Sequence, residues 1–414
     1  MSRVRRRGSR LPLQGLALLL SGLACCLFTC CLLAPVRSLA ADTEGEEQVQ
    51  ASEQESDQAQ ESDRAEELLQ EELDLEQINE TLEEIFPDEK LDFGETVRAI
   101  ITGDLSVSVD LLGQLISDQL FHALEVNRES LIHMILIAVI AAVFANFAEV
   151  FQARQISEIS FYVLYMLMIA LCLGAFQSAA AWVEDGIRLL TEFMKALCPV
   201  YFIAVSLAKG SMTAAAFYNL ALLVILLVEV FMVKLLLPAL HVYMMIKVLN
   251  YLSQEEYLSR FIELIETVVS WTLKTLLALV IGLNTIQGLI APAIDSVKRS
   301  VLTRGVEAIP GVGDAIGGTA EVILGTAVVV KNGIGIAGVI ICFALCAVPL
   351  VQAGLMALMY KLAAAVLEPV SDKRLIGCIG GMADACQLLM RLIFTAGMLF
   401  LLTVAIVAAT TNSG

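Results

Sequence analysis

The chain has 414 residues, of which 58% are hydrophobic and 17% charged, and its mean hydropathy is +0.78. A composition this apolar excludes an ordinary soluble domain and predicts an all-α polytopic membrane protein. The net charge of −18 does not describe the membrane part, because half of the 44 acidic residues fall between positions 42 and 95.

Residues 1–40 have the pattern of a secretory signal peptide. Five arginines precede an apolar stretch at 11–34, and Ala40 closes a small-residue cleavage motif, Ser-Leu-Ala. The apolar stretch is long for a signal peptide, so an uncleaved signal anchor is the alternative. In both cases the basic N-terminus stays inside and residue 42 onward is exported.

An acidic extracytoplasmic segment is expected at residues 41–130. Positions 42–65 are rich in Glu, Gln and Ser and contain almost no apolar residue, which predicts disorder. From position 68 leucines and isoleucines recur at helical spacing, which predicts an amphipathic helix ending near Phe86-Pro87. A second, weaker amphipathic stretch covers 105–124. The first helix is either a solvated spacer or a surface that docks on an extracytoplasmic partner.

The membrane domain is expected at residues 131–414. Apolar runs cover 131–151, 159–182, 193–208, 214–249, 268–294, 332–360 and 392–414. About 20 apolar residues cross a bilayer, so the run at 214–249 should bend or divide near Lys234 and Pro238. Residues 253–266 have the pattern of an interfacial helix. Together these runs predict about six to eight transmembrane helices.

Two glycine-rich segments, each with an Asp-Ala dipeptide, flank the long apolar run in the C-terminal half. Acidic residues and clustered glycines beside bilayer-length runs often mark function. They predict broken or re-entrant helices of the kind found at transport sites, or glycines that allow close helix packing with the acids at the interface. The candidate pore or gating residues are Gly311, Gly313, Asp314, Gly317, Gly318, Glu321, Gly380, Gly381 and Asp384.

Basic residues suggest an orientation for these segments. Lys298, Arg299 and Arg304 form one basic loop, and Lys373 and Arg374 belong to another. The positive-inside rule places both loops in the cytoplasm. Residues 311–330 must then either cross the membrane or enter and leave it from the same side.

Other chemistry-bearing residues are sparse. Glu149 and Glu229 are candidate intramembrane acids, although each has an alternative position near the headgroups. No nucleotide-binding loop, zincin motif or nucleophile elbow is present, and the three histidines are widely separated. The sequence therefore predicts no catalytic, cofactor or metal site, and no enzyme.

Four stretches of the C-terminal half resemble the stage III sporulation protein AE family. They are residues 309–315 (Ile-Pro-Gly-Val-Gly-Asp-Ala), 330–338, 367–374 (Leu-Glu-Pro-Val-Ser-Asp-Lys-Arg) and 381–385 (Gly-Met-Ala-Asp-Ala). The third is the most specific. The resemblance covers nearly the whole mature chain, except that the acidic tract at 42–70 carries no family weight.

The resemblance implies a role in endospore formation. Family members are expected in the mother-cell membrane around the engulfed forespore, within a channel or secretion-like complex. The implied partners are a cytoplasmic ATPase, ring-forming membrane proteins and, indirectly, a forespore-side protein, with no nucleic acid. No catalytic residues carry over from the family.

The hypothesis is therefore an integral subunit of that channel complex, with a permease-like core, required after engulfment. Two alternatives stay open. One is an independent ion-coupled secondary transporter, and the other is a membrane scaffold with no conduit of its own. Neutral substitutions at Asp314 and Asp384 would separate the three.

Overall fold

The computed structural model describes residues 75–85, 92–101, 132–133, 135–136, 139–140, 154–208, 211–252, 257–307, 313–369 and 371–410. Within these ranges all the regular secondary structure is helical. Two short helices, α4 (Glu76–Ile85) and α5 (Phe93–Ile101), precede the long ones, which are α7 (Arg154–Ala208), α8 (Ser211–Leu227), η1 (Val228–Leu236), α9 (Leu237–Leu252), α10 (Ser259–Glu307), α11 (Gly313–Leu367) and α12 (Lys373–Thr410). The predicted all-α fold is confirmed.

Five helical stretches of the described chain are long and apolar enough to cross a membrane. They are Tyr162–Ala208, Ser211–Leu252, Ser259–Gln287, Gly325–Leu367 and Lys373–Ile406. Four are much longer than the ~20 residues that a bilayer requires. The chain therefore has the helices of a polytopic membrane protein.

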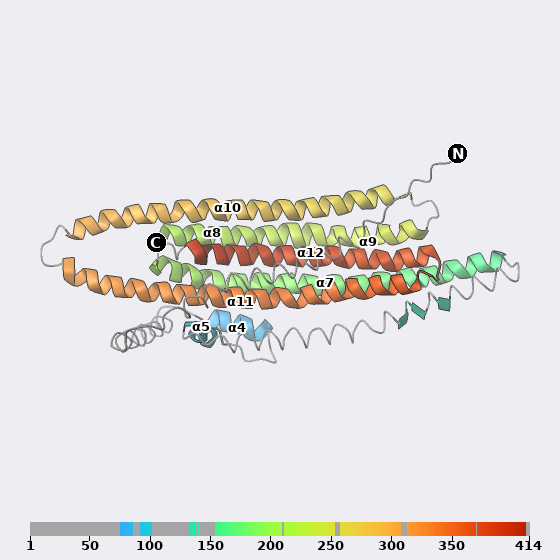
Figure 1. Cartoon of the computed structure of the whole chain (residues 1–414), viewed down its shortest axis with the longest axis horizontal. Coiled ribbons are helices and arrows are strands. Elements are labelled where there is room, and N and C mark those ends of the chain that lie inside the picture. Colours follow the sequence, from blue (N-terminus) through green and yellow to red (C-terminus); the bar gives the residue numbers. More distant parts are fainter. Residues whose placement is uncertain are drawn as a thin grey trace, which may run out of the picture. The chain divides into compact units, whose positions relative to one another are not determined.

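The long helices form one bundle with an apolar core (Figure 1). α7 and α11 are antiparallel, because Gly186 of α7 packs on Pro349 while Leu197 of α7 packs on Gly338. α11 and α12 are antiparallel too, since Cys346 contacts Gly397 and Gly354 contacts Met390. At such glycines an added Cβ would collide with the neighbouring helix, so small residues allow the close approach that membrane helices use.

A π-helix lies where the sequence predicts that the run at 214–249 should bend or divide, near Lys234 and Pro238. α8, η1 and α9 form one continuous helix, and the N–H of Leu237 donates to the carbonyl of Met232, five residues back. The next residue, Pro238, has no N–H, and in a regular α-helix its ring would clash with the carbonyl four residues before it. The wider π-turns relieve that clash without breaking the helix.

The predicted acidic helix is present and ends at Ile85, before Pro87. α4 buries Ile78 and Leu82, and α5 buries Phe93 and Val97. α4 packs on α7 and α5 on α11, so these apolar faces are covered by the chain's own bundle. This outcome differs from both expectations for the segment, a solvated spacer and a surface for an external partner. The sequence analysis had not predicted α5.

Several boundaries differ from prediction. The backbone is helical without a break from Gly313 to Leu367 and from Lys373 to Thr410, so the predicted broken or re-entrant segments are continuous helices here. The runs at 159–182 and 193–208 form the single helix α7, because the polar residues between them occupy its exposed face. The interfacial helix at 253–266 is instead the start of α10. Five candidate spans lie in the described chain, and the predicted span at 131–151 falls mostly outside it.

Other predictions fall outside the described residues. These are the signal peptide with its cleavage site at Ala40, the disordered tract at 42–65, the stretch at 105–124 and most of the run at 131–151. The domain limits at 1–40, 41–130 and 131–414 therefore stay predictions.

Candidate functional site between α9 and α12

An ion pair joins the two helices near the end of the bundle where α9 ends and α12 begins. Lys247 of α9 places its Nζ 2.7 Å from Oδ2 of Asp384 on α12. The lysine side chain is 9% exposed and the aspartate side chain 43% exposed. The lysine is thus enclosed by protein, while the carboxylate is reachable from outside.

Tyr243 holds the lysine in place. It lies one helical turn before Lys247 on the same face of α9, and Lys247 Nζ donates a hydrogen bond to its hydroxyl at 2.7 Å. The stem of Lys247 runs along α12 at Gly381, where an added Cβ would lie 3.3 Å from Cγ. A larger residue at 381 would press on this stem. Gly381 therefore contributes to the site because it leaves room for the lysine side chain.

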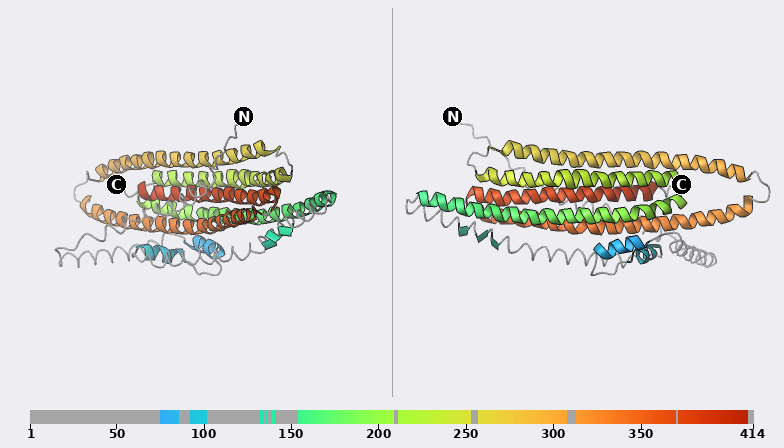
Figure 2. Two further views of the ribbon diagram at one scale, coloured as in Figure 1. Left: turned by 45° about the vertical axis from the view of Figure 1, so that its right-hand side comes forward. Right: turned by 180° about the vertical axis from the view of Figure 1, so that it is seen from behind.

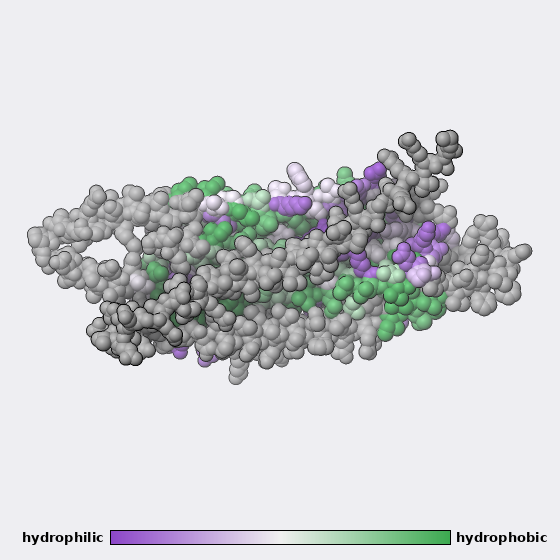
Figure 3. Space-filling view, in the orientation of Figure 1, coloured by the Kyte–Doolittle hydropathy of each residue, from purple (hydrophilic) through white to green (hydrophobic). Residues whose placement is uncertain are grey.

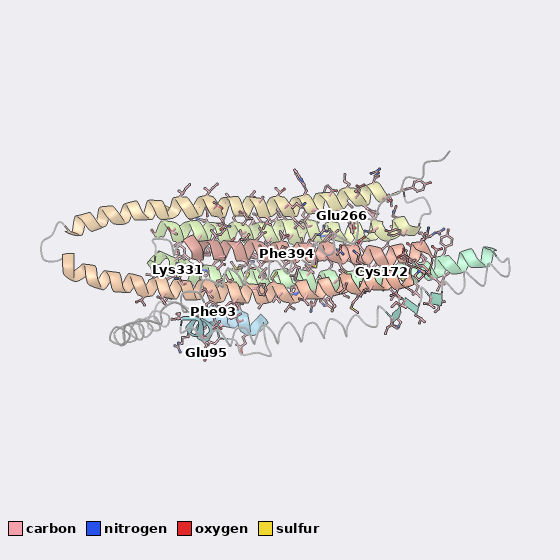
Figure 4. The ribbon with its side chains drawn as sticks, in the orientation of Figure 1. Phe93, Glu95, Cys172, Glu266, Lys331 and Phe394 are labelled. Atoms are coloured by element: carbon pink, nitrogen blue, oxygen red, sulfur yellow. The ribbon has the colours of Figure 1, made fainter. Side chains whose placement is uncertain are left out.

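Further polar contacts fix the end of α9. The hydroxyl of Tyr165 on α7 donates to the Val248 carbonyl at 2.8 Å, and the Asn250 side chain bonds Ser259 and the Leu258 N–H in the turn to α10. The ring of Tyr251 lies against Gly377. Figure 4 shows Glu266 and Cys172 toward this end of the bundle, and Lys331 toward the other. The end of α9 that carries Lys247 is therefore in contact with α7, α10 and α12.

In this geometry only Asp384, and not Lys247, can exchange its partner with the surroundings. The lysine cannot leave without exposing a buried cation, whereas the carboxylate can exchange its partner for water, a proton or another ion. Removing one partner of a buried pair is costly, because it leaves the other charge uncompensated. The pair can hold α9 and α12 together. Alternatively, it can break when a proton or another ion binds to Asp384.

A group of thiols lies next to this site. Cys172 of α7 and Cys378 of α12 have their sulfur atoms 3.5 Å apart, and Cys386 is also buried. They form no disulfide and pack as small apolar side chains. Within the described ranges, no set of three or more His, Cys, Asp or Glu side chains could hold a metal ion.

The predicted site residues separate into two places. Asp384 is in the ion pair and Gly381 supports it, whereas a methyl group added at Gly380 would meet no atom within 4 Å. Gly313, Asp314, Gly317, Gly318 and Glu321 lie on the first turns of α11, with their side chains outside the described part of the chain, and Gly311 lies outside it altogether.

The two glycine-rich segments lie far apart in this structure. α11 and α12 are antiparallel, so the start of α11 and the start of α12 lie at opposite ends of the helix pair. Gly354 of α11 contacts Met390, which is six residues beyond Asp384 on α12, and 40 positions of helix, about 60 Å, separate Asp314 from Gly354. Asp314 and Asp384 therefore do not form one gate within a single copy.

The two candidate acids also differ. Glu229, in η1, forms an ion pair with Lys195 of α7 at 2.5 Å, and both side chains are well exposed. Glu149 lies outside the described residues. Lys247, Lys195 and Tyr243 were not predicted from the sequence. The one signal for Lys247 was a lysine inside the apolar run at 214–249, and its partner is 137 residues away.

Comparison with known proteins assigns this chain to a protein family. A family model described as "Stage III sporulation protein AE" matches residues 91–411, most of the chain. The chain belongs to the stage III sporulation protein AE family. The match includes α5 and every long helix and begins after both the acidic tract at 42–70 and α4. The resemblance seen in the sequence is thus confirmed.

One curated relative of this AE-family chain is "Stage III sporulation protein AE" of Bacillus subtilis (strain 168). The two are 22% identical over 318 residues, which cover 77% of this chain and 80% of the relative. No solved structure matches. The AE-family chain is therefore a sporulation-related protein with several apolar, membrane-type helices.

Proposed function

We propose that this chain is an integral membrane subunit, with a permease-like core, of a channel or secretion-like complex that links mother cell and forespore. Membership of the stage III sporulation protein AE family carries this proposal. The five candidate spans suit an integral subunit, and the ion pair supplies a charged site between two of them.

The proposed place of action is the mother-cell membrane around the forespore, after engulfment. The proposed partners are a cytoplasmic ATPase, ring-forming membrane proteins and, indirectly, a forespore-side protein, with no nucleic acid. The chain has no nucleotide-binding motif, so energised transport would need an ATPase from a separate protein. Its own role would be non-enzymatic and need no cofactor.

The test is deletion of the gene in its host, followed by induced sporulation. Forespore size and the yield of heat-resistant spores are measured beside a fluorescently tagged copy of the protein. The expected result is arrest after engulfment, with the tag concentrated around the forespore. Normal spores together with a solute-uptake defect would contradict the proposal.

A secondary transporter is the second candidate, favoured by the Lys247–Asp384 pair. Charged residues between helices of a membrane bundle often belong to ion pathways. The pair of substitutions Lys247→Met and Asp384→Leu removes both charges together, so no buried charge is left alone. If the deletion strain carrying this double variant sporulates normally, the pair is structural and the transporter hypothesis loses its support.

A scaffold without a conduit is the third candidate. The close glycine contacts of α11 with α7 and α12 favour it, because they leave these helices in direct contact. A double variant that reaches the membrane and assembles with its partners, yet blocks sporulation, would speak against a scaffold. The matched control is Glu229→Gln, which removes an exposed pair from the same continuous helix.

A further inference from the structure

Arg391 lies in the middle of α12 and has no charged partner among the described residues. The helix is one of the candidate membrane spans. The Arg391 side chain is partly exposed, and its Nε is buried without a hydrogen-bond acceptor. None of the ion pairs between described residues includes it. An unpaired charge in a membrane-type helix is costly and usually has a function. A carboxylate from outside this copy of the chain would compensate it.

Arg391 belongs to a stripe of partly exposed residues on α12. Its members recur at alternating intervals of three and four residues, the spacing of a helix face that packs along one other helix. This α12 stripe consists of Asp384, Gln387, Arg391, Phe394, Met398 and Leu401. The stripe therefore has the spacing required to pack against one further helix.

A second stripe with the same spacing lies on α7. This α7 stripe consists of Ser178, Ala181, Asp185, Arg188, Glu192 and Lys195, each exposed or partly exposed. In Figure 2, α7 runs across the front of the bundle seen from behind, so this side of α7 is not covered by the other long helices. On the face drawn in Figure 3, hydrophilic residues occur among hydrophobic ones. Charged side chains are thus part of the bundle's outer surface.

The two stripes lie at the same level of the bundle. α7 and α12 are parallel, because Cys172 faces Cys378 and Gly186 lies near Ile393, at offsets of 206 and 207 positions. Adding 206 to each number of the α7 stripe gives the α12 stripe, member by member. Asp185 is therefore level with Arg391.

Within one copy the two stripes point in opposite directions. Ala181 follows Cys172 by nine residues, and Gln387 follows Cys378 by nine residues. Nine residues turn a helix by about 180°. Because the two cysteines face each other, Ala181 and Gln387 face away from each other. A contact between the α7 stripe and the α12 stripe therefore requires two copies of the chain.

Symmetry brings the stripes of two copies together at matching levels. Copies inserted in one membrane share their orientation, so symmetric copies are related by a rotation about the membrane normal. Such a rotation keeps every residue at its depth. The α7 stripe of one copy and the α12 stripe of the next can then meet head to tail, in register along their whole length.

We infer that the α7 stripe and the α12 stripe form the interface between neighbouring copies of this chain. Asp185 then lies opposite Arg391 of the next copy and provides the carboxylate that Arg391 lacks in its own. Pairs between arginine and a carboxylate are among the strongest hydrogen-bonded pairs in proteins. This inference does not depend on the proposed function.

Two glycines support a close approach of the helices. Gly174 and Gly380 lie one turn before the two stripes begin and are also level with each other. An added methyl group at either would meet no atom within 4 Å in its own copy. Small residues allow membrane helices to pack closely, and alanine is small enough to keep such a contact.

The remaining charges of the α7 stripe are compatible with this interface. Arg188 would lie opposite Phe394 of the next copy, and an arginine over an aromatic ring is a favourable contact. Glu192 keeps its partner Arg188, and Lys195 keeps Glu229, within their own copy. The interface therefore leaves none of these charges without a partner.

Cysteine crosslinking in membranes tests the interface. Ala181→Cys is placed in a copy with one tag and Gln387→Cys in a copy with another, and neither side chain is buried. Serine replaces Cys25, Cys26, Cys30 and Cys31 in both copies, and the six other native cysteines are buried. Molecular oxygen, with copper phenanthroline as catalyst, is the oxidant. It takes two electrons and two protons from the two thiols, which form a disulfide, and becomes hydrogen peroxide.

The expected result is a crosslinked dimer that carries both tags. Each variant alone should give no dimer, because each stripe meets only the other stripe. The matched control pairs Ala181→Cys with Met398→Cys, which lies 11 positions from the matching level, about 16 Å along the helix, and should not crosslink. A dimer formed by either variant alone, or no dimer in any combination, overturns the inference.

Charge exchange tests the Asp185–Arg391 pair on the same crosslink. Arg391→Asp places two carboxylates opposite each other and should lower the crosslinked fraction about tenfold. Asp185→Arg should have a similar effect, and copies that carry both changes should recover most of the crosslinking. Equal crosslinking in all variants overturns the inference. Neither experiment needs a sporulating cell, so their outcomes are independent of the deletion test.

Discussion

Two ion pairs lie on the same continuous helix and differ in their surroundings. Near its middle, Glu229 of η1 meets Lys195 of α7, with side chains 39% and 50% exposed. Near its end, Lys247 of α9 meets Asp384 of α12, and there the lysine is only 9% exposed. The charges are the same, and what differs is how much water each partner keeps.

The comparison shows where a charge is costly for this fold. An exposed pair gains little, because water already solvates both partners. A pair with one buried member must stay intact, because that member has nothing else to compensate it. The loss of one partner of the Lys247–Asp384 pair should therefore destabilise the fold more than the loss of the exposed pair.

The largest effect is expected from Asp384→Leu. It leaves the Lys247 ammonium buried without its counter-ion and should destabilise the bundle by about 3 kcal/mol. Thermal unfolding of the purified protein in detergent measures it. The double variant Lys247→Met with Asp384→Leu should recover most of the loss. A single variant as stable as the parent would show that water enters the site freely.

A smaller loss is expected from Gly377→Ala. The new Cβ would lie 2.5 Å from a ring carbon of Tyr251, so the ring or α12 must move, at about 1–3 kcal/mol. Gly380→Ala is the matched control, because its Cβ meets nothing within 4 Å. That change should be neutral or stabilise the helix by about 0.5–1 kcal/mol. Equal losses for both glycines, in the same thermal assay, would reject packing as the cause.

Breaking the exposed pair should matter less. Glu229→Gln is expected to change stability by at most about 1 kcal/mol, and high salt should reduce the difference further. The comparison is thermal unfolding at low and high ionic strength. A salt-independent loss as large as that of Asp384→Leu would mean that Glu229 is buried in the membrane-embedded protein.

The smallest effect is expected from Arg188→Gln. Its two ion pairs are long and exposed, so the change should stay within about 0.5 kcal/mol. Vesicle-reconstituted protein is the better sample here, since lipid contact at residue 188 would make the arginine's removal clearly stabilising. Such a gain would show that residue 188 faces lipid.

Sequence reasoning predicted the helical membrane class, the family, the end of the acidic helix before Pro87 and the irregularity near Pro238. These rest on local signals, namely apolar runs, a helix breaker and a proline. It also named Asp384 as a candidate, and its partner Lys247 could not be identified, because their pairing depends on how α9 and α12 pack.

The glycine-rich segments show why the helix packing and the helix boundaries could not be predicted from the sequence. A glycine cluster fits a broken helix and a tight helix contact equally well, because both need the absence of a Cβ. Gly377 and Gly381 serve the second purpose, against Tyr251 and Lys247. Likewise the polar residues between 182 and 193 looked like a loop, and they form an exposed face of an unbroken helix instead.

The π-helix at Val228–Leu236 has a consequence for insertions and deletions in this chain. Each hydrogen bond there encloses one residue more than an α-helical bond does, so the stretch contains spare chain length. Deleting one residue within it could be absorbed by tightening to α-helix, leaving α8 and α9 facing as before. The same deletion inside α9, beyond Pro238, would turn Lys247 about 100° away from Asp384. Length variation in this helix should therefore be tolerated within the π-helix and selected against between Pro238 and Lys247.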